Sequence, residues 1–145
     1  MSFLDALKAS ASGLSAQRLR MNLISSNLAN INTTRTEQGG PYKRKDAVFA
    51  AVPQHNEFSQ VLSQRLNSGL SEVKITAILE DKRAPIMKHD PSHPDADAQG
   101  NVALPNINIV EEMVNMISAS RSYEANVTAV NVTKEMASSA LDIGR

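Results

Sequence analysis

Apolar residues recur at heptad spacing along both ends of the chain, and this spacing constrains the fold more than any other feature. Near the N-terminus the main row is Leu7, Leu14, Met21 and Leu28, and three or four residues from its members lie Leu4, Ala11, Ile24 and Ile31. Steps of three and four residues predict one helix over about residues 3–29 with a single apolar face. The polar stretch NLISSNLANINTT then ends the helix, because Asn30 and Asn32 tolerate the left-handed backbone found at helix ends.

The C-terminal part of the chain repeats this spacing. Its apolar face is interrupted clearly only at Lys134, and consists of Ile109, Met113, Met116, Ser120, Tyr123, Val127, Val130, Lys134, Ala137 and Leu141. No glycine or proline occurs between residues 106 and 143, so one long helix is expected. Either Asn106 or Asn108 is suited to cap its start. Glu111 and Glu112 follow where the helix dipole favours negative charge.

The middle of the chain has a different character. The segments YKRKDAVFAAV and SEVKITAILED predict two strands, near residues 43–52 and 73–79, and APIMKHD predicts a short third. The segment NEFSQVLSQRLNSG, residues 56–69, is spaced like a short helix, and HDPSHPDADAQGN has the composition of a loop. We therefore expect an α+β protein in three parts. These are an N-terminal assembly helix (1–35), a small β-rich middle domain (36–105) and a C-terminal assembly helix (106–145).

Composition narrows the possible functions. The 145 residues carry 15 basic and 15 acidic side chains, so the sequence lacks the basic surface of a nucleic-acid binder, and a protein partner is expected instead. No apolar run is long enough for direct membrane insertion, and Asp5 and Lys8 interrupt the region where a secretory signal would be apolar. There is no cysteine, which excludes disulfides and thiolate chemistry.

The loop at residues 89–101 is the one candidate for cation binding. Asp95, Asp97, Gln99 and Gly100 match positions 1, 3, 5 and 6 of a calcium loop, but Asn106 stands where position 12 requires a glutamate. The same acidic stretch suits a turn closed by Asx hydrogen bonds, which we favour. No G-x-S-x-G, Walker or H-E-x-x-H motif occurs. We therefore expect no metal, no cofactor and no enzymatic activity.

Two apolar helix faces can be covered in two ways. They can pair within the chain, or they can pack against neighbouring subunits of a polymer. Val110, Val114 and Ile117 widen the C-terminal face beyond what one partner helix covers, which favours the polymer. The alternative is a self-contained soluble protein-binding module, with both helices folded on the middle and a cation-binding acidic loop.

Three segments resemble a known family. SSNLANINT, with Ala29, Asn30 and Thr33 as an A-N-x-x-T core, resembles the N-terminal signature of the bacterial flagellar rod and hook proteins. The run DADAQGNVALPNINIVEEMVNMISASRSYEANVTAVN, together with GGPYKRKDAVF, resembles the proximal-rod members of that family. The likeness covers most of the chain, and the segment at 56–69 departs from it by being longer and more helical.

The resemblance implies a structural subunit of the flagellar basal-body rod, the drive shaft that crosses the periplasm. Its partners would be other flagellar rod subunits, copies of itself, and the flagellar type III export apparatus. In the family the terminal helices pair as a coiled-coil-like inner domain, and Asn27, Asn30 and Thr33 would shape the exit from the first helix. The implied assembly interface consists of Leu7, Leu14, Met21, Asn27, Leu28, Asn30, Thr33, Met113, Met116, Tyr123, Val127 and Val130.

Overall fold

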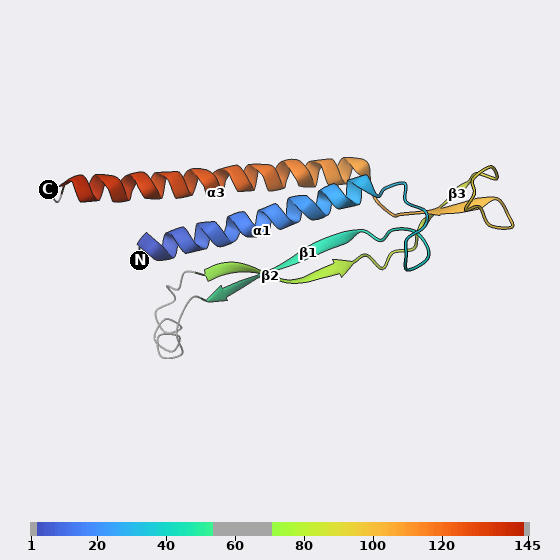
Figure 1. Cartoon of the computed structure of the whole chain (residues 1–145), viewed down its shortest axis with the longest axis horizontal. Helices are drawn as coiled ribbons and strands as arrows, with labels where there is room; N and C mark the ends of the chain where they lie inside the picture. The colour runs from blue at the N-terminus through green and yellow to red at the C-terminus, as the bar shows by residue number, and fades with distance from the viewer. Residues whose placement is uncertain (1–2, 54–70, 144–145) are drawn as a thin grey trace.

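The computed structural model describes residues 3–53 and 71–143 (Figure 1). The elements follow the order α1 (Phe3–Ala29), β1 (Lys45–Pro53), β2 (Ser71–Glu80), β3 (Ile86–His89), β4 (Asn101–Leu104) and α3 (Ile109–Ile143). In chain order, a helix precedes and a helix follows a small β region of two sheets. The predicted α+β class is therefore confirmed.

The two helices run antiparallel along one another, and α3 continues past the N-terminal end of α1 (Figure 1). This follows from their lengths, 27 residues for α1 and 35 for α3. Both helices span the residues that the heptad spacing predicted. Within the described residues, neither helix is sufficiently apolar to cross a bilayer.

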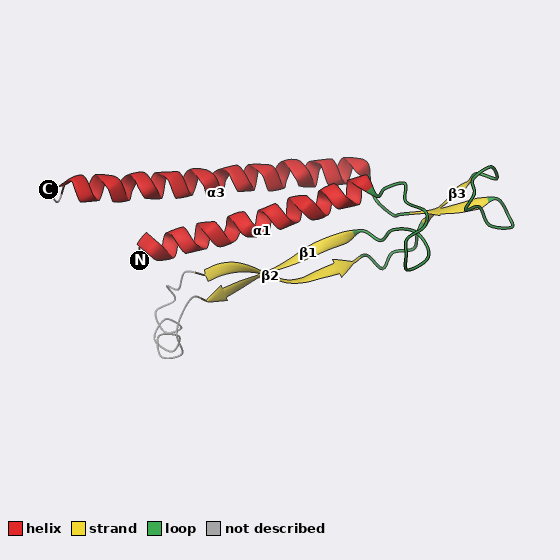
Figure 2. Cartoon of the chain, viewed as in Figure 1, coloured by secondary structure: helices red, strands yellow, loops and turns green. Residues whose placement is uncertain are grey.

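The β region consists of two separate antiparallel hairpins (Figure 2). Strands β1 and β2 pair from Lys45↔Glu80 to Pro53↔Ser71, and this hairpin packs along α1. Strands β3 and β4 pair from Ile86↔Leu104 to His89↔Asn101 and lie beyond the ends of the helices (Figure 2). Strands β1, β2 and β3 were expected from the sequence. Strand β4 was not, and its first residue, Asn101, ends the stretch that was expected to be a loop. The helix expected at 56–69 lies outside the described residues.

Buried side chains are concentrated where α1 ends and α3 begins. The buried apolar residues are Ala16, Ile24, Val102, Ile107 and Ala119, and two polar residues, Asn27 and Glu112, are buried with them. Many large apolar side chains elsewhere on the described surface remain exposed. A core this thin leaves much apolar surface to be covered by other molecules.

The face of α3 that meets α1 differs from the predicted one on one of its two heptad rows. Glu112 and Ala119 are 1% and 0% exposed, whereas Met113 is 52% exposed. Farther along, Asn126 approaches the backbone of Gly13, since a Cβ at residue 13 would lie 2.9 Å from the Asn126 amide nitrogen. Met113 is therefore exposed on the single chain, and its place in the assembly interface stays a prediction. Small side chains permit the close approach, and Glu112 finds polar partners in the interior.

Candidate assembly interface

Asn27 joins the end of α1 to the start of β1. Its side chain is fully buried, and its Oδ1 accepts a hydrogen bond from the Lys45 backbone N–H at 2.9 Å. Its Nδ2 donates to the Lys45 carbonyl oxygen, also at 2.9 Å. The carboxamide therefore pairs with Lys45 as a peptide group of a neighbouring strand would. Tyr42 adds a third bond, donating from its hydroxyl to Asn27 Oδ1 at 3.1 Å.

Glu112 brings α3 into the same cluster. Its Oε2 accepts from Asn27 Nδ2 at 3.1 Å, and its Oε1 accepts from Arg44 Nε at 2.7 Å. Burial works against the charge of Arg44, but the hydrogen bond and the negative charge of Glu112 outweigh it and raise the pKa of the guanidinium. We call Asn27, Tyr42, Arg44 and Glu112 the polar junction. It ties α1, β1 and α3 together at one point.

Asn30 and Thr33 form the exit from α1. Asn30 Nδ2 donates to the Ser26 carbonyl oxygen at 2.8 Å, which satisfies a carbonyl in the last turn of the helix. Thr33 Oγ1 donates to Asn30 Oδ1 at 3.2 Å, and the Thr33 carbonyl accepts from the Tyr42 N–H at 3.1 Å. These bonds turn the chain back toward the strand that contains Lys45.

Asn108 begins α3. Its Oδ1 accepts hydrogen bonds from the backbone N–H groups of Val110 and Glu111, at 2.9 and 3.4 Å. This is the N-cap geometry, so of the two predicted caps the structure selects Asn108. Asn106 instead donates from its side chain to the Ala84 carbonyl oxygen at 3.1 Å.

The first two turns of α3 carry a row of exposed apolar side chains, which we call the apolar stripe. Each of its members is between 49% and 69% exposed. The stripe consists of Ile109, Val110, Met113, Val114 and Ile117. It is continuous along the helix surface, because these positions are three or four residues apart.

The other predicted interface residues differ in their burial. Two of them, Leu28 and Met113, are exposed. The half-buried ones are Leu7, Leu14 and Met21 on α1, with Met116, Tyr123, Val127 and Val130 on α3. No local pattern in the sequence assigns a role to Tyr42 or Arg44, and Glu112 was expected only to interact with the helix dipole in the first turn of α3. An Arg–Glu pair separated by 68 residues leaves no periodic signal in a sequence.

The carboxylates of the acidic loop are engaged by the chain itself. Asp97 Oδ1 accepts from the N–H groups of Gln99 and Asn101 at 2.9 and 2.8 Å, an Asx turn that holds the pKa of this carboxyl below its usual range. Asp95 Oδ2 accepts from Thr34 Oγ1 at 2.7 Å. Across residues 3–53 and 71–143, acidic and histidine side chains form no group of three that could hold a metal ion.

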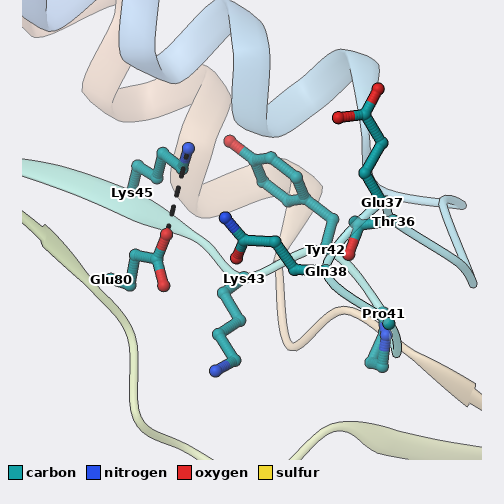
Figure 3. A pocket seen from close by; sticks show the side chains of 9 residues that line it. Thr36, Glu37, Gln38, Pro41, Tyr42, Lys43, Lys45 and Glu80 are labelled. Atoms are coloured by element: carbon teal, nitrogen blue, oxygen red, sulfur yellow. Dashed lines mark ion pairs between the residues drawn. The ribbon is translucent and has the colours of Figure 1, made fainter.

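A cavity of about 380 Å³ lies beside the polar junction (Figure 3). Polar side chains of the 36–45 segment surround it, and Lys45 and Glu80 form a loose ion pair across 3.9 Å at its edge (Figure 3). Tyr42 is the one junction residue in its lining. The cavity contains none of the residues predicted for the assembly interface.

Comparison with known proteins identifies the family. Residues 7–35 match the family described as "Flagella basal body rod protein". Residues 98–143 match the family described as "Flagellar basal body rod FlgEFG protein C-terminal". The chain is 44% identical to the flagellar basal-body rod protein FlgC of Borreliella burgdorferi, over 99% of this chain and 98% of that protein. The FlgC proteins of Bacillus subtilis and Salmonella typhimurium are 43% and 35% identical over the full length of both chains. The chain belongs to the FlgC family of flagellar basal-body rod proteins.

As a member of the FlgC family, the chain is a structural subunit of the rod in the flagellar basal body. Rod proteins assemble with other components of the flagellar rod. A self-contained binding module with a cation site is not favoured. One family match covers most of α1 and its exit, and the other runs from the end of the acidic loop through α3. They therefore include Asn27 and Glu112 of the polar junction.

Proposed function

We propose that this FlgC-family chain polymerises through its terminal helices and forms part of the shaft that passes torque along the proximal rod. The observation that carries the proposal is the apolar stripe on α3. Five large apolar side chains remain about half exposed on two successive turns of one helix. Covering them releases roughly 25 cal/mol for each Å² of apolar surface removed from water, which is a driving force for helix packing between subunits.

The position of α1 supports this assignment. The β1–β2 hairpin and α3 both pack against α1, so the chain itself covers much of that helix. The outer side of α3 has no such cover in the described residues, and it is the surface that a neighbouring helix can reach. The occupants we propose are helices of further copies and of other rod subunits.

The proposed interface keeps the residues expected from the sequence and adds the stripe. Its predicted part consists of Leu7, Leu14, Met21, Asn27, Leu28, Asn30, Thr33, Met113, Met116, Tyr123, Val127 and Val130. Asn27, Asn30 and Thr33 act indirectly in this scheme, by fixing where the chain leaves α1. Residues 1–35 and 106–145 form the assembly helices, and residues 36–105 form the outer part.

The role we propose is mechanical and not catalytic. Transmission of torque requires stiff elements, and α3 is a continuous helix of 35 residues without glycine or proline. Export through the flagellar type III apparatus belongs to the same proposal and is supported by the family alone. In a strain without that apparatus, the chain should remain in the cytoplasm.

The test places one carboxylate in the stripe. Val114→Asp should leave the helix content and unfolding midpoint of the chain nearly unchanged, because residue 114 is on the surface. In a strain that lacks the native gene, it should prevent the formation of rods and hence swimming motility. The matched control is Thr128→Asp, which puts the same charge on the outward side of α3, five turns beyond Val110. Motility retained by Val114→Asp, or lost equally in both variants, contradicts the proposed surface.

A further inference from the structure

Helix α3 has two possible contact faces that share one heptad row. The shared row is Met116, Tyr123, Val130 and Ala137. One face adds the row of Met113, Ser120 and Val127, and the other adds the row of Glu112, Ala119 and Asn126. Successive residues are 100° apart around a helix, so the centres of the two faces differ by half of this, about 50°.

The structure uses the less apolar face. Burying Met113 would remove more apolar surface from water than burying Glu112, and an isolated buried carboxylate is costly. The helix nevertheless places Glu112 at 1% exposure and leaves Met113 half exposed. Apolar packing between the helices therefore does not account for this rotation of α3.

The hydrogen-bond partners of Glu112 provide the stabilisation that apolar packing does not account for. Its two carboxylate oxygens are held separately, Oε1 by Arg44 Nε at 2.7 Å and Oε2 by Asn27 Nδ2 at 3.1 Å. Asn27 belongs to α1, and Arg44 directly precedes β1. Rotating α3 by about 50° would withdraw the carboxylate from both donors. Arg44, whose side chain is only 15% exposed, would then lose its shorter ion pair.

We propose that Glu112, held by Arg44 and Asn27, sets the rotation of α3 and thereby keeps the apolar stripe on the outside of the helix pair. Without this carboxylate, α3 turns toward the more apolar face and carries Ile109 and Met113 against α1. Glu112 is a positioning residue in this scheme, and it makes no contact with a neighbouring subunit. The consequence for assembly rests on the proposed function, whereas the rotation itself does not.

Engineered disulfides report the rotation, because the chain contains no cysteine of its own. The first pair is Gly13→Cys with Asn126→Cys, which joins positions that are in contact in the structure. The second pair is Gly13→Cys with Val127→Cys, which forms in the rotated state. The second pair also carries Asn126→Ala, so that the side chain 2.9 Å from a Cβ at residue 13 does not obstruct it.

Each pair is introduced into the full-length chain, which is oxidised at low protein concentration and analysed by mass spectrometry for intramolecular disulfide. In the otherwise unchanged protein the 13–126 disulfide should dominate. In the Arg44→Met/Glu112→Met background, which removes both charges together, the ratio of 13–127 to 13–126 disulfide should rise by about tenfold or more. The control is Glu111→Met, the same change at an exposed neighbour, and it should leave the ratio unchanged.

An unchanged ratio in the folded double variant overturns the proposal. If the double variant shows no cooperative unfolding, Glu112→Gln decides, because it keeps the size of the side chain and weakens the hold of Arg44. Its ratio should shift in the same direction by a smaller factor, and a ratio equal to that of the unchanged protein overturns the proposal as well. Failure of the proposed function is distinguishable, because it appears as normal rods in Val114→Asp and leaves the disulfide ratio unaffected.

Discussion

The two ends of the α1–α3 pair are held together in different ways. At the end where α1 stops and α3 begins, Ile24, Asn27, Ile107 and Glu112 are buried and the polar junction joins three elements. Toward the opposite end, none of the described residues of α3 beyond Ala119 is fully buried. There the helices meet through small and polar side chains, such as Gly13 and Asn126.

This contrast shows where the geometry of the pair is decided. Hydrogen bonds are directional, so the junction fixes the register and rotation of the helices at one end. Apolar and small side chains tolerate several arrangements, so the other end follows the first. The same contrast leaves the outer side of α3 free to meet neighbouring molecules.

The largest effect is expected from removing the junction carboxylate. Glu112→Ala should lower the free energy of unfolding by about 3 kcal/mol, because Arg44 is poorly hydrated and, among the described residues, would keep the ion pair with the exposed Asp46 and lose the shorter one. Urea denaturation measures this loss. Glu111→Ala, in the same turn but exposed, should cost less than about 0.5 kcal/mol. Similar losses in the two variants would show that the junction contributes no more than the surface.

A smaller loss is expected where the helices meet through half-buried side chains. Leu14→Asp and Val127→Asp should each cost about 1–3 kcal/mol in urea, because the carboxylate at a half-buried site retains part of its water. Under the proposed function, both variants also lose rod assembly and motility. Arg18→Ala, at an exposed position of α1, is the control and should change the free energy of unfolding only slightly. Functional rods in both aspartate variants would remove these positions from the interface.

The close contact between Gly13 and Asn126 should change the effect of Gly13→Ala on the free energy of unfolding by about 1 kcal/mol. Alanine favours a helix over glycine by about 1 kcal/mol, but its Cβ at residue 13 would lie 2.9 Å from the Asn126 amide nitrogen. Gly13→Ala should therefore gain little in the unchanged protein and about 1 kcal/mol in an Asn126→Ala background. A double-mutant cycle measured by thermal unfolding gives the coupling. Equal gains in both backgrounds would show that the helices do not approach closely here.

The smallest effect is expected in the acidic loop, which lies outside the helix pair. The pKa of Asp97 is lowered in the folded chain by backbone N–H groups, so its bonds are present at neutral pH and are lost as pH falls below about 4. Amide exchange at Gln99 and Asn101 should then accelerate beyond the ordinary pH dependence. Asp97→Asn keeps an acceptor and should remove this step. A step that persists in Asp97→Asn assigns the titration to another group.

Local sequence patterns predicted most of the secondary structure. The heptad rows indicated the extent of both helices, β-branched and aromatic residues indicated β1, and alternation of apolar residues indicated β2. These signals are readable because helix and strand periods depend on neighbouring residues only. Strand β4 was not expected, although β3 of the same length was, and the pairing of the two becomes apparent only in the folded hairpin.

The predicted interface residues of α3 differ in burial. Met116, Tyr123 and Val130 are half-buried, whereas Met113 is exposed. An apolar pattern shows that a helix has a face to bury and leaves a choice between faces that overlap. Here the choice fell on the row with Glu112, which apolarity alone would place on the surface.

The sequence by itself determined the two helices and the family to which the chain belongs, because each depends on local spacing or on motifs of adjacent residues. Tertiary structure decided the rotation of α3 and, with it, which apolar residues remain exposed. Arg44 and Glu112 are separated by 68 residues, and Asn27 and Glu112 by 85. A buried charge is stable only where the folded chain brings its partners to it, and no local pattern specifies such a meeting.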